Sequence, residues 1–193
     1  MSGASDAVHG AVLLAAGASR RLGHPKQLVE LDGEPLIRRA ARVLLATAPL
    51  DAVVVLAQAN PALLDALAGL AIRPVIAPDA SEGLSASLRT GLAAHDPRCE
   101  GALVAVTDQP ALSAAHVLAL RDAWHAAPAR SVASAYAGVL GVPALLPRHW
   151  FAAISRLRGD ADARALLRDR AADVTAVAAA ALERDIDAPV DLR

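Results

Sequence analysis

Hydrophobic positions along the chain follow two patterns, which alternate. The first is a short apolar run, which predicts a strand. Such strands are expected over residues 10–17, 51–57, 73–78 and 101–108, and the continuous apolar run at 10–17 is typical of a strand buried on both faces. The second is an apolar residue every three to four positions, which predicts amphipathic helices. These helices are expected over residues 35–47, 61–70 and 84–95. Strands that alternate with helices predict an α/β fold, with a parallel sheet covered on both faces.

The pattern becomes less regular after Ser113, where a helix is expected as far as about His125. Two apolar segments broken by Gly and Pro then follow, which favours an antiparallel strand. A helix over 161–171 and a closing strand near 172–178 complete the chain, and the alanine run at 178–181 is interpreted as a strand end or a short helical turn. We therefore expect one domain over 1–193, a Rossmann-like three-layer α/β/α fold with a mostly parallel central sheet and a partly antiparallel C-terminal half.

Composition removes several classes of function. The formal net charge of -1 argues against nucleic-acid partners, which require a strongly basic face. Apolar stretches are far shorter than a membrane span, and the first residues lack a signal-peptide pattern, so a soluble cytoplasmic protein is expected. The single cysteine, Cys99, excludes an internal disulfide and a cysteine-rich zinc site. The histidines show no metal-binding spacing, and Trp124 and Trp150 are expected to be packing residues.

The loop after the first predicted strand carries the most chemistry. In a parallel sheet, ligands bind beyond the carboxyl ends of the strands. The loop offers Gly17, Ser19, Arg21, Gly23 and Lys26 within ten residues, but neither the dinucleotide fingerprint nor the Walker pattern fits. Of the 19 Lys and Arg residues, only Lys26 is lysine, so a compact ammonium is needed here where arginine serves elsewhere. Glycines, a hydroxyl and fixed cations suit a polyphosphate, although a plain glycine turn with solvated basic residues would look alike.

The longer string resolves part of this ambiguity. L-A-A-G-x-S-x-R-x-G-x-P-K-x-L over 14–28, followed by D-G-E-P-L at 32–36, resembles the nucleotidyltransferase signature of the GT-A-like superfamily, especially the molybdenum cofactor cytidylyltransferase and guanylyltransferase branch. The resemblance extends from Val12 to Leu192. It implies that Arg21 and Lys26 are catalytic. It also implies a first set of nucleotide-binding residues: Leu14, Ala15, Ala16, Gly17 and Ser19.

The same resemblance implies a Mg²⁺ site. The V-T-D-Q-P sequence at 106–110 fits the superfamily's acidic residue at a strand end, so Asp108 is the first candidate ligand. The segment 184–192 resembles D-I-D-T-P-E-D-L, which makes Asp187 the second candidate and Asp185 a further one. Carboxylates together with substrate phosphates are the ligands that Mg²⁺ prefers. Alternatively, Asp108 belongs to a turn or caps the helix after Ser113, and the C-terminal acids form a frayed tail.

A third motif is expected to meet the base and ribose. Residues 77–92 resemble the family's G-x-x-x-S-L-R-x-G-L element, where a loop becomes a helix. The implied nucleotide-binding residues are Pro78, Gly83, Ser85 and Ser87, with Arg89 one turn further on. A helix start favours negative groups. The alternative is that Ser81 or Ser85 is only the N-cap.

Two further stretches are implied to face the acceptor. Residues 136–146 and 157–167 resemble the Y-x-G-x-x-G-x-P and G-D-x-G-A-R-x-L-L elements of the cytidylyltransferase branch. The implied acceptor-binding residues are Tyr136, Gly141, Pro143, Asp160 and Arg164. The chain departs from the family at Asp162, where Gly is usual. A side chain there alters the backbone geometry or adds a negative charge, so the identity of the acceptor is the implication that this departure affects most. Arg164 and Asp160 would otherwise form only a surface pair.

Taken together, the resemblance implies a Mg²⁺-dependent transfer of CMP from CTP to the phosphate of molybdopterin, with release of pyrophosphate. Ala16 favours CTP because the family's guanosine enzymes tend to have Gly there. A molybdoenzyme or its chaperone is the expected receiving partner. The alternatives are a GTP-using guanylyltransferase, a transferase for a phosphorylated sugar or isoprenoid precursor, a non-catalytic nucleotide-binding or cofactor-delivery module, and an unrelated α/β domain.

Overall fold

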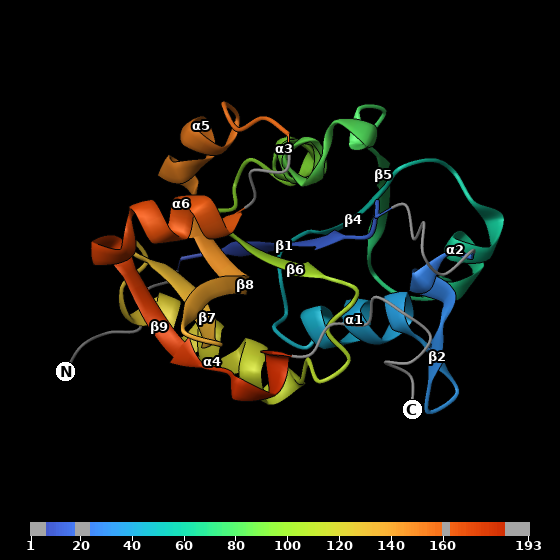
Figure 1. Cartoon of the computed structure of the whole chain (residues 1–193), viewed down its shortest axis with the longest axis horizontal. Coiled ribbons are helices and arrows are strands. Elements are labelled where there is room, and N and C mark those ends of the chain that lie inside the picture. The colour runs from blue at the N-terminus through green and yellow to red at the C-terminus, as the bar shows by residue number, and fades with distance from the viewer. Residues whose placement is uncertain (1–6, 18–23, 160–162, 184–193) are drawn as a thin grey trace.

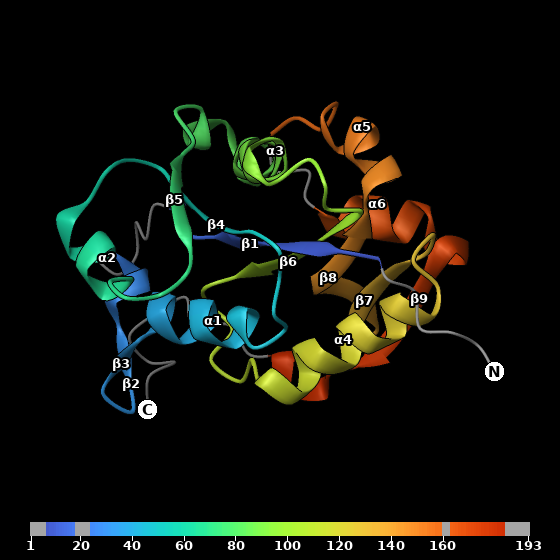
Figure 2. The same ribbon diagram turned by 180° about the vertical axis from the view of Figure 1, so that it is seen from behind.

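The computed structural model describes residues 7–17, 24–159 and 163–183. Its centre is a seven-stranded sheet with the strand order β5-β4-β1-β6-β8-β7-β9 (Figures 1 and 2). The strands are β1 (His9–Leu14), β4 (Ala52–Leu56), β5 (Arg73–Ile76), β6 (Gly101–Val106), β7 (Ser131–Tyr136), β8 (Val139–Pro147) and β9 (Val174–Ala178). This arrangement confirms the predicted α/β class.

Helices cover both faces of the sheet, as both views show. One face carries α1 (Leu36–Leu45) and α4 (Ala114–Ala126), with α2 (Pro61–Ala66) beside them at the β5 edge. The opposite face carries α3 (Leu84–Ala94), α5 (Phe151–Ile154) and α6 (Ala163–Asp169). Short 3-10 turns connect these elements: η1 (Lys26–Leu28), η2 (Ala80–Glu82), η3 (Arg148–Trp150), η4 (Ala171–Asp173) and η5 (Ala180–Glu183). The three predicted layers are therefore present.

The core is divided in two by the sheet because successive strand residues point to opposite faces. In β1, Leu13 joins the cluster that contains Trp124 of α4. Its neighbour Val12 joins the other cluster, with Leu88 of α3 and Trp150. Both tryptophans are almost fully buried, which confirms their predicted packing role.

Strand directions follow the predicted change along the chain. β1 pairs in parallel with β4 and with β6, and β4 pairs in parallel with β5. β8 is antiparallel to both β6 and β7, whereas β9 is parallel to β7. The chain therefore leaves β1 toward one side for β4 and β5 and returns on the other side with β6. Such a switch point opens a crevice at the carboxyl ends of the two strands.

Two local predictions differ from the structure, and one element was not predicted. The helix expected over 61–70 ends at Ala66, and Gly69 has a φ of 78°. Pro35 precedes α1 as its N-cap and is not in its first turn. A small hairpin, β2 (Glu30–Leu31) and β3 (Glu34–Pro35), was not predicted. Within the described parts of the chain, no helix has the length and apolar character needed to cross a membrane.

Candidate active site

The first and strongest sequence motif meets the candidate metal ligand at the carboxyl ends of β1 and β6. These strands pair in parallel, with Leu14 opposite Val106. The loop that contains Lys26 leaves β1, and Asp108 lies two residues beyond β6. The Lys26 ammonium donates to Asp108 Oδ2 over 2.5 Å. Two motifs separated by 82 residues therefore supply one ion pair at this end of the sheet.

This ion pair is partly withdrawn from solvent. The Lys26 side chain is 15% exposed and the Asp108 side chain 22% exposed. Charges act more strongly in such a position than on an open surface, because less water screens them. The alternative interpretation of Asp108 as a helix cap is wrong, since Ser113 caps α4 by accepting from the backbone N–H of His116.

Gln27 holds the start of the loop and was not singled out from the sequence. Its side chain is buried, and its amide donates to the carbonyl of Ala15 over 2.7 Å and to that of Gly17 over 3.0 Å. Ala15 is further tied to β4, because its N–H donates to Val55. The stem of Lys26 passes close to Gly17, where an added Cβ would lie 3.8 Å from Lys26 Cε. The signal for Gln27 was its position directly after the lysine of the motif.

Several predicted site residues lie outside the described part of the chain. These are the loop residues Ser19 and Arg21, the acceptor candidate Asp160 and the second metal candidate Asp187, together with Asp162 and Asp185. Their predicted roles remain predictions. Leu14, Ala15, Ala16 and Gly17 are described, and they run from the buried end of β1 to an exposed glycine.

The third motif begins α3 but is joined to the segment after α5. Gly83 is the N-cap of α3, with a φ of 117° and no side-chain capping bond, so capping by Ser85 is wrong. Ser85 is buried and donates to the carbonyl of Gly159 over 2.7 Å. Arg89 donates to the carbonyl of Leu157 over 2.6 Å. The structure thus connects this motif to the first residues of the 157–167 element.

The remaining nucleotide candidates lie near this junction. Ser87 is buried within α3, whereas Pro78 is exposed in the turn after β5. Ala77, the preceding residue, donates its N–H to Leu56 at the end of β4. Pro78 and Gly83 therefore belong to the connection between the carboxyl end of β5 and α3, on the same side of the sheet as the β1 loop.

The acceptor candidates Tyr136, Gly141 and Arg164 lie together around the Tyr136 phenol, and Pro143 follows Val142, whose carbonyl accepts from that phenol. The Tyr136 hydroxyl donates to the carbonyl of Val142 and accepts from Arg164 Nη2, over 3.0 and 3.3 Å. An added Cβ at Gly141 would lie 2.5 Å from that hydroxyl, so a side chain there would displace the tyrosine. The peptide bond before Pro143 is cis.

Gln109 connects the residues around Tyr136 to the ion pair of Lys26 and Asp108. It follows Asp108 directly, is buried, and its amide nitrogen lies 3.3 Å from the Tyr136 hydroxyl and 3.1 Å from the Val142 carbonyl. Sequence reasoning missed this contact, which links β6 to the β7–β8 hairpin. Because the backbone beyond Asp108 is fixed in this way, the carboxylate and the hairpin are held in one orientation.

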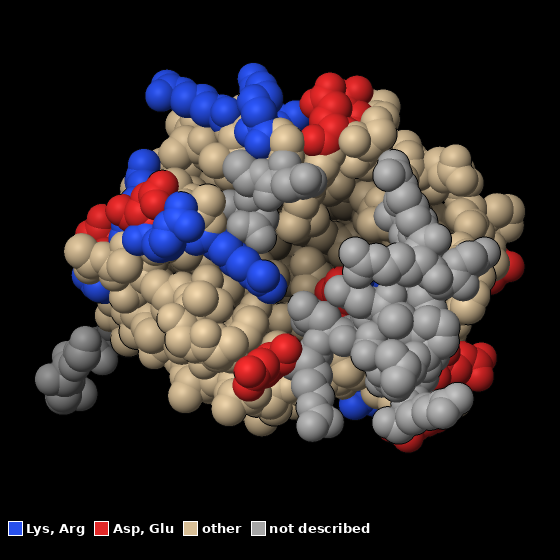
Figure 3. Space-filling model, viewed as in Figure 1, with Lys and Arg blue, Asp and Glu red and all other residues tan. Residues whose placement is uncertain are grey.

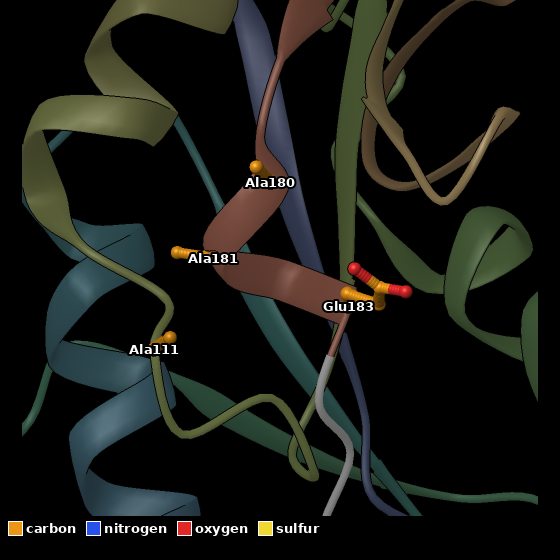
Figure 4. Close-up of a pocket in the computed structure, with 4 residues that line it drawn as sticks. All are labelled: Ala111, Ala180, Ala181 and Glu183. Atoms are coloured by element: carbon orange, nitrogen blue, oxygen red, sulfur yellow. The ribbon is translucent and has the colours of Figure 1, made fainter.

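A cavity of about 630 Å³ opens beside the loop that follows Asp108. Ala111 lines one side, and Ala180, Ala181 and Glu183 of η5 line the other (Figure 4). Ala180 and Glu183 also line a second cavity, of about 490 Å³, beside the β7–β8 hairpin and Tyr136. Small side chains leave room here, and the size is typical of small-molecule sites. The small side chains of the alanine run therefore leave room for the cavity. Glu183 adds a carboxylate to its lining, which was not predicted.

Asp108 has the chemistry of a Mg²⁺ ligand. Mg²⁺ is commonly held by one or two carboxylates plus substrate phosphates. Among the described residues, no group of three or more His, Cys, Asp or Glu side chains could hold a metal ion without a substrate. Asp108 alone would therefore need phosphate oxygens or further carboxylates to complete the coordination of Mg²⁺. Figure 3 shows that the molecule is hollowed on the face seen in that view.

Comparisons with known proteins identify the family of this chain. The model of the MobA-like NTP transferase domain matches residues 11–175. The purine catabolism protein PucB of Bacillus subtilis (strain 168) is 30% identical over 166 residues, which cover 81% of this chain and 79% of PucB. The bifunctional enzyme IspD/IspF of Anaeromyxobacter dehalogenans (strain 2CP-C) is 42% identical over 118 residues, which cover 60% of this chain but only 29% of that enzyme.

A solved structure shows the same fold over almost the whole length. Rv0371c of Mycobacterium tuberculosis H37Rv is 25% identical, with a TM-score of 0.79 over 97% of this chain and 96% of that chain. The same protein has been solved in complex with manganese, with a TM-score of 0.76, 25% identity and 95% coverage of each chain. With the match over residues 11–175 and the relatives above, the chain belongs to the MobA-like NTP transferase family and is a nucleotidyltransferase.

Proposed function

We propose that this nucleotidyltransferase transfers CMP from CTP to the phosphate of molybdopterin, releases pyrophosphate and requires Mg²⁺. The observation that carries the proposal is the ion pair of Lys26 with Asp108 at the carboxyl ends of β1 and β6. An ammonium and a carboxylate at a strand-end crevice are the groups that a metal-bound triphosphate needs.

In this mechanism the residues position and neutralise phosphates. An oxygen of the acceptor phosphate forms a bond to the α-phosphorus of CTP, and the bond from that phosphorus to pyrophosphate breaks in line. Lys26 and Arg21 bind the phosphate oxygens and stabilise the charge that develops on the leaving pyrophosphate. Gln27 keeps the loop backbone between Ala15 and Gly17 in place for the incoming triphosphate. No covalent enzyme intermediate is required.

Asp108 and Asp187 are proposed to hold the Mg²⁺, which, when bound, supplies positive charge to the phosphates. The ion pair changes when substrate binds, because Lys26 then has phosphate oxygens as alternative partners. The manganese complex of Rv0371c supports a divalent cation in this family. Ala16, half-buried at the end of β1, supports CTP as donor, since its methyl group limits how closely a base edge approaches.

The acceptor is proposed to bind beside Tyr136 and the residues that surround its phenol. Tyr136, Arg164 and the neighbouring cavities form the part of the site nearest to the β7–β8 hairpin. Arg164 provides a guanidinium for the acceptor's phosphate, a geometry that arginine suits well. Gly141 and Pro143 shape the hairpin around the tyrosine.

The test is a pyrophosphate-release assay with purified protein, Mg²⁺ and molybdopterin. CTP is expected to support release, GTP to support it far less, and omission of the acceptor or chelation of the metal to abolish it. Phosphorylated sugar and isoprenoid precursors serve as alternative acceptors in parallel reactions. Release with one of those acceptors and none with molybdopterin would overturn the acceptor. CTP binding without release under every condition would favour a non-catalytic module.

A further inference from the structure

A third cavity lies toward the other end of the sheet from the ion pair. It measures about 430 Å³ and lies between α3 and α5, which are neighbours on one face of the sheet (Figures 1 and 2). Its lining includes Arg89, His95, Arg148 and Phe151. Arg148 is anchored at the start of β6, since its N–H donates to Glu100. Asp108 lies beyond the opposite end of the six-residue β6. At the usual rise per residue, this strand separates Arg148 from Asp108 by roughly 20 Å.

His95 lies in the wall of this cavity. Its side chain is only 5% exposed, and both ring nitrogens are covered by the surrounding protein. The ring therefore forms part of the wall and presents no nitrogen at the cavity surface. Burial lowers the pKa of His95, which favours the neutral ring.

The charges around the cavity are positive. No ion pair joins Arg148 to a carboxylate in the described parts of the chain, and its guanidinium bonds only to the carbonyl of Cys99 and lies 5.9 Å from the Phe151 ring centre. Two nearby carboxylates are already engaged: Asp51 pairs with Arg73 and Asp96 pairs with Arg98, each over 2.8 Å. Glu82 pairs with Arg89 more loosely, over 3.5 Å.

Further basic groups extend this character to the rim. Arg156 and Arg158 are exposed just after α5, and Figure 3 shows basic side chains gathered over that end of the helix layer. The chain as a whole carries a net charge of only -1, so this concentration is local. Positive potential of this kind attracts compact anions.

We infer that this cavity between α3 and α5 is a binding site for a small phosphorylated molecule, separate from the nucleotide site. Arg148 would bind the phosphate, as guanidinium groups commonly do. His95 lies in the cavity wall beside it, where its ring environment reports whether the cavity is occupied. The rest of the lining, Leu92, Phe151 and Ile154, is apolar and suits the organic part of a phosphate ester. A cavity of this volume is within the usual range for small ligands.

The experiment uses the full chain with ¹⁵N-labelled histidine, and phenyl phosphate as the probe. A saturable change in the His95 imidazole resonance is expected with phenyl phosphate and with inorganic phosphate, and none with phenol at matched ionic strength. Tighter binding of phenyl phosphate assigns the site to an ester, and equal binding assigns it to phosphate alone. No saturable change at His95 with either anion would overturn the inference.

Single substitutions show which residues bind phenyl phosphate. Arg148→Gln is expected to weaken phenyl phosphate binding about tenfold or more, because one charge-assisted contact is lost. Arg168→Gln, at an exposed ion pair of α6, is the matched control and should bind as the wild type does. Lys26→Ala should also retain the His95 response, since the nucleotide site is elsewhere. Unchanged binding by Arg148→Gln, or loss of the response in Lys26→Ala, would contradict a separate site.

Discussion

At the scale of single residues, Lys26 and Asp108 have the central roles in the proposed transfer. Lys26 is the only lysine in a chain with 19 basic residues, and it is paired with Asp108 in a half-buried position. Arginine replaces lysine freely on solvated surfaces, but its planar fork does not replace a compact ammonium beside phosphate oxygens. The unusual composition and the observed ion pair therefore point to the same residue.

Lys26→Ala and Asp108→Asn are each expected to lower turnover by about 10²- to 10³-fold, as the loss of a charge-stabilising group typically does. Both variants should remain folded, because each side chain of the pair still reaches water, which solvates the charge that is left when its partner is removed. Steady-state pyrophosphate release and a urea titration check the two statements. Lys26→Arg, which keeps the charge, should recover only part of the rate. A wild-type rate in Lys26→Ala would be incompatible with the mechanism.

Gln27→Leu is expected to loosen the phosphate loop. The substitution keeps the approximate volume but removes the donors to Ala15 and Gly17, at a cost of about 1–3 kcal/mol for carbonyls left unpaired. The KM for CTP should rise because the loop is no longer held for the triphosphate. Gln58→Leu, at an exposed position after β4, is the control and should change neither quantity. A Gln27→Leu variant with unaltered KM and stability would show that the two hydrogen bonds do not organise the loop.

At the scale of elements, the strands and helices of the first half were predictable because their apolar residues form clear patterns. β1, β4 and β6 are continuous apolar runs, and α1 has a distinct apolar face. The β2–β3 hairpin was missed because two-residue strands show no alternation. Its signal was the Asp32–Gly33 pair, which adopts φ values of 54° and 77° at the turn, as such pairs favour.

The candidate site was predictable only in its local part. Lys26 and Asp108 stood out because motif positions identified them before any contact was known. The contact of Gln109 with Tyr136 spans 27 residues and depends on how β6, β7 and β8 pair, which no local pattern specifies. The same holds for Ser85, whose hydroxyl bonds to a carbonyl 74 residues away. The space beside η5 arises from alanines, whose small size has no distinctive sequence signal.

Gly91→Ala is expected to destabilise the contact of α3 with the sheet. An added Cβ at Gly91 would overlap the Val12 side chain and lie 2.9 Å from Val55 Cγ2. Overpacking of this kind costs about 1–3 kcal/mol, although alanine is otherwise the better helix former by about 1 kcal/mol. Urea denaturation measures the change, and Ala93→Ser on the exposed side of the same helix is the control. A more stable Gly91→Ala protein would show that the helix does not approach the sheet this closely.

At the scale of the whole molecule, the sheet order explains why distant motifs form one site. β1 lies between β4 and β6, so the loops after β1 and β6 open on the same crevice. The antiparallel β8 then places the β7–β8 hairpin next to β6. The motifs proposed to bind the nucleotide and the acceptor therefore lie at one edge of the sheet, although they occupy different halves of the chain.

Global stability is expected to fall as pH decreases from about 6.5 toward 4, because of buried histidine. Burial, reinforced by His125 and Arg121, lowers the pKa of His9 from 6.5 to about 4, so the unfolded chain binds a proton that the folded chain does not. Linkage puts the loss at roughly 3 kcal/mol across this range. His95 and His116, whose pKa values are also lowered by burial, act in the same direction.

Urea denaturation at a series of pH values checks this expectation. His9→Gln should show a smaller loss of stability on acidification, since glutamine can still donate to Thr47, the present partner of His9, but does not titrate. His149→Gln, at an exposed histidine, should behave as the wild type does. Identical pH dependence in wild type and His9→Gln would assign the acid sensitivity to other groups.

We propose that a CMP group moves from CTP to molybdopterin at this site. The most direct measurement follows radioactive phosphorus from the α-position of CTP in reactions with molybdopterin and Mg²⁺. The label should appear in a pterin dinucleotide with the wild-type protein and be nearly absent from that product with Lys26→Ala. Label that remains in CTP or is released as free CMP with the wild-type protein, while no pterin product forms, would contradict the proposed transfer.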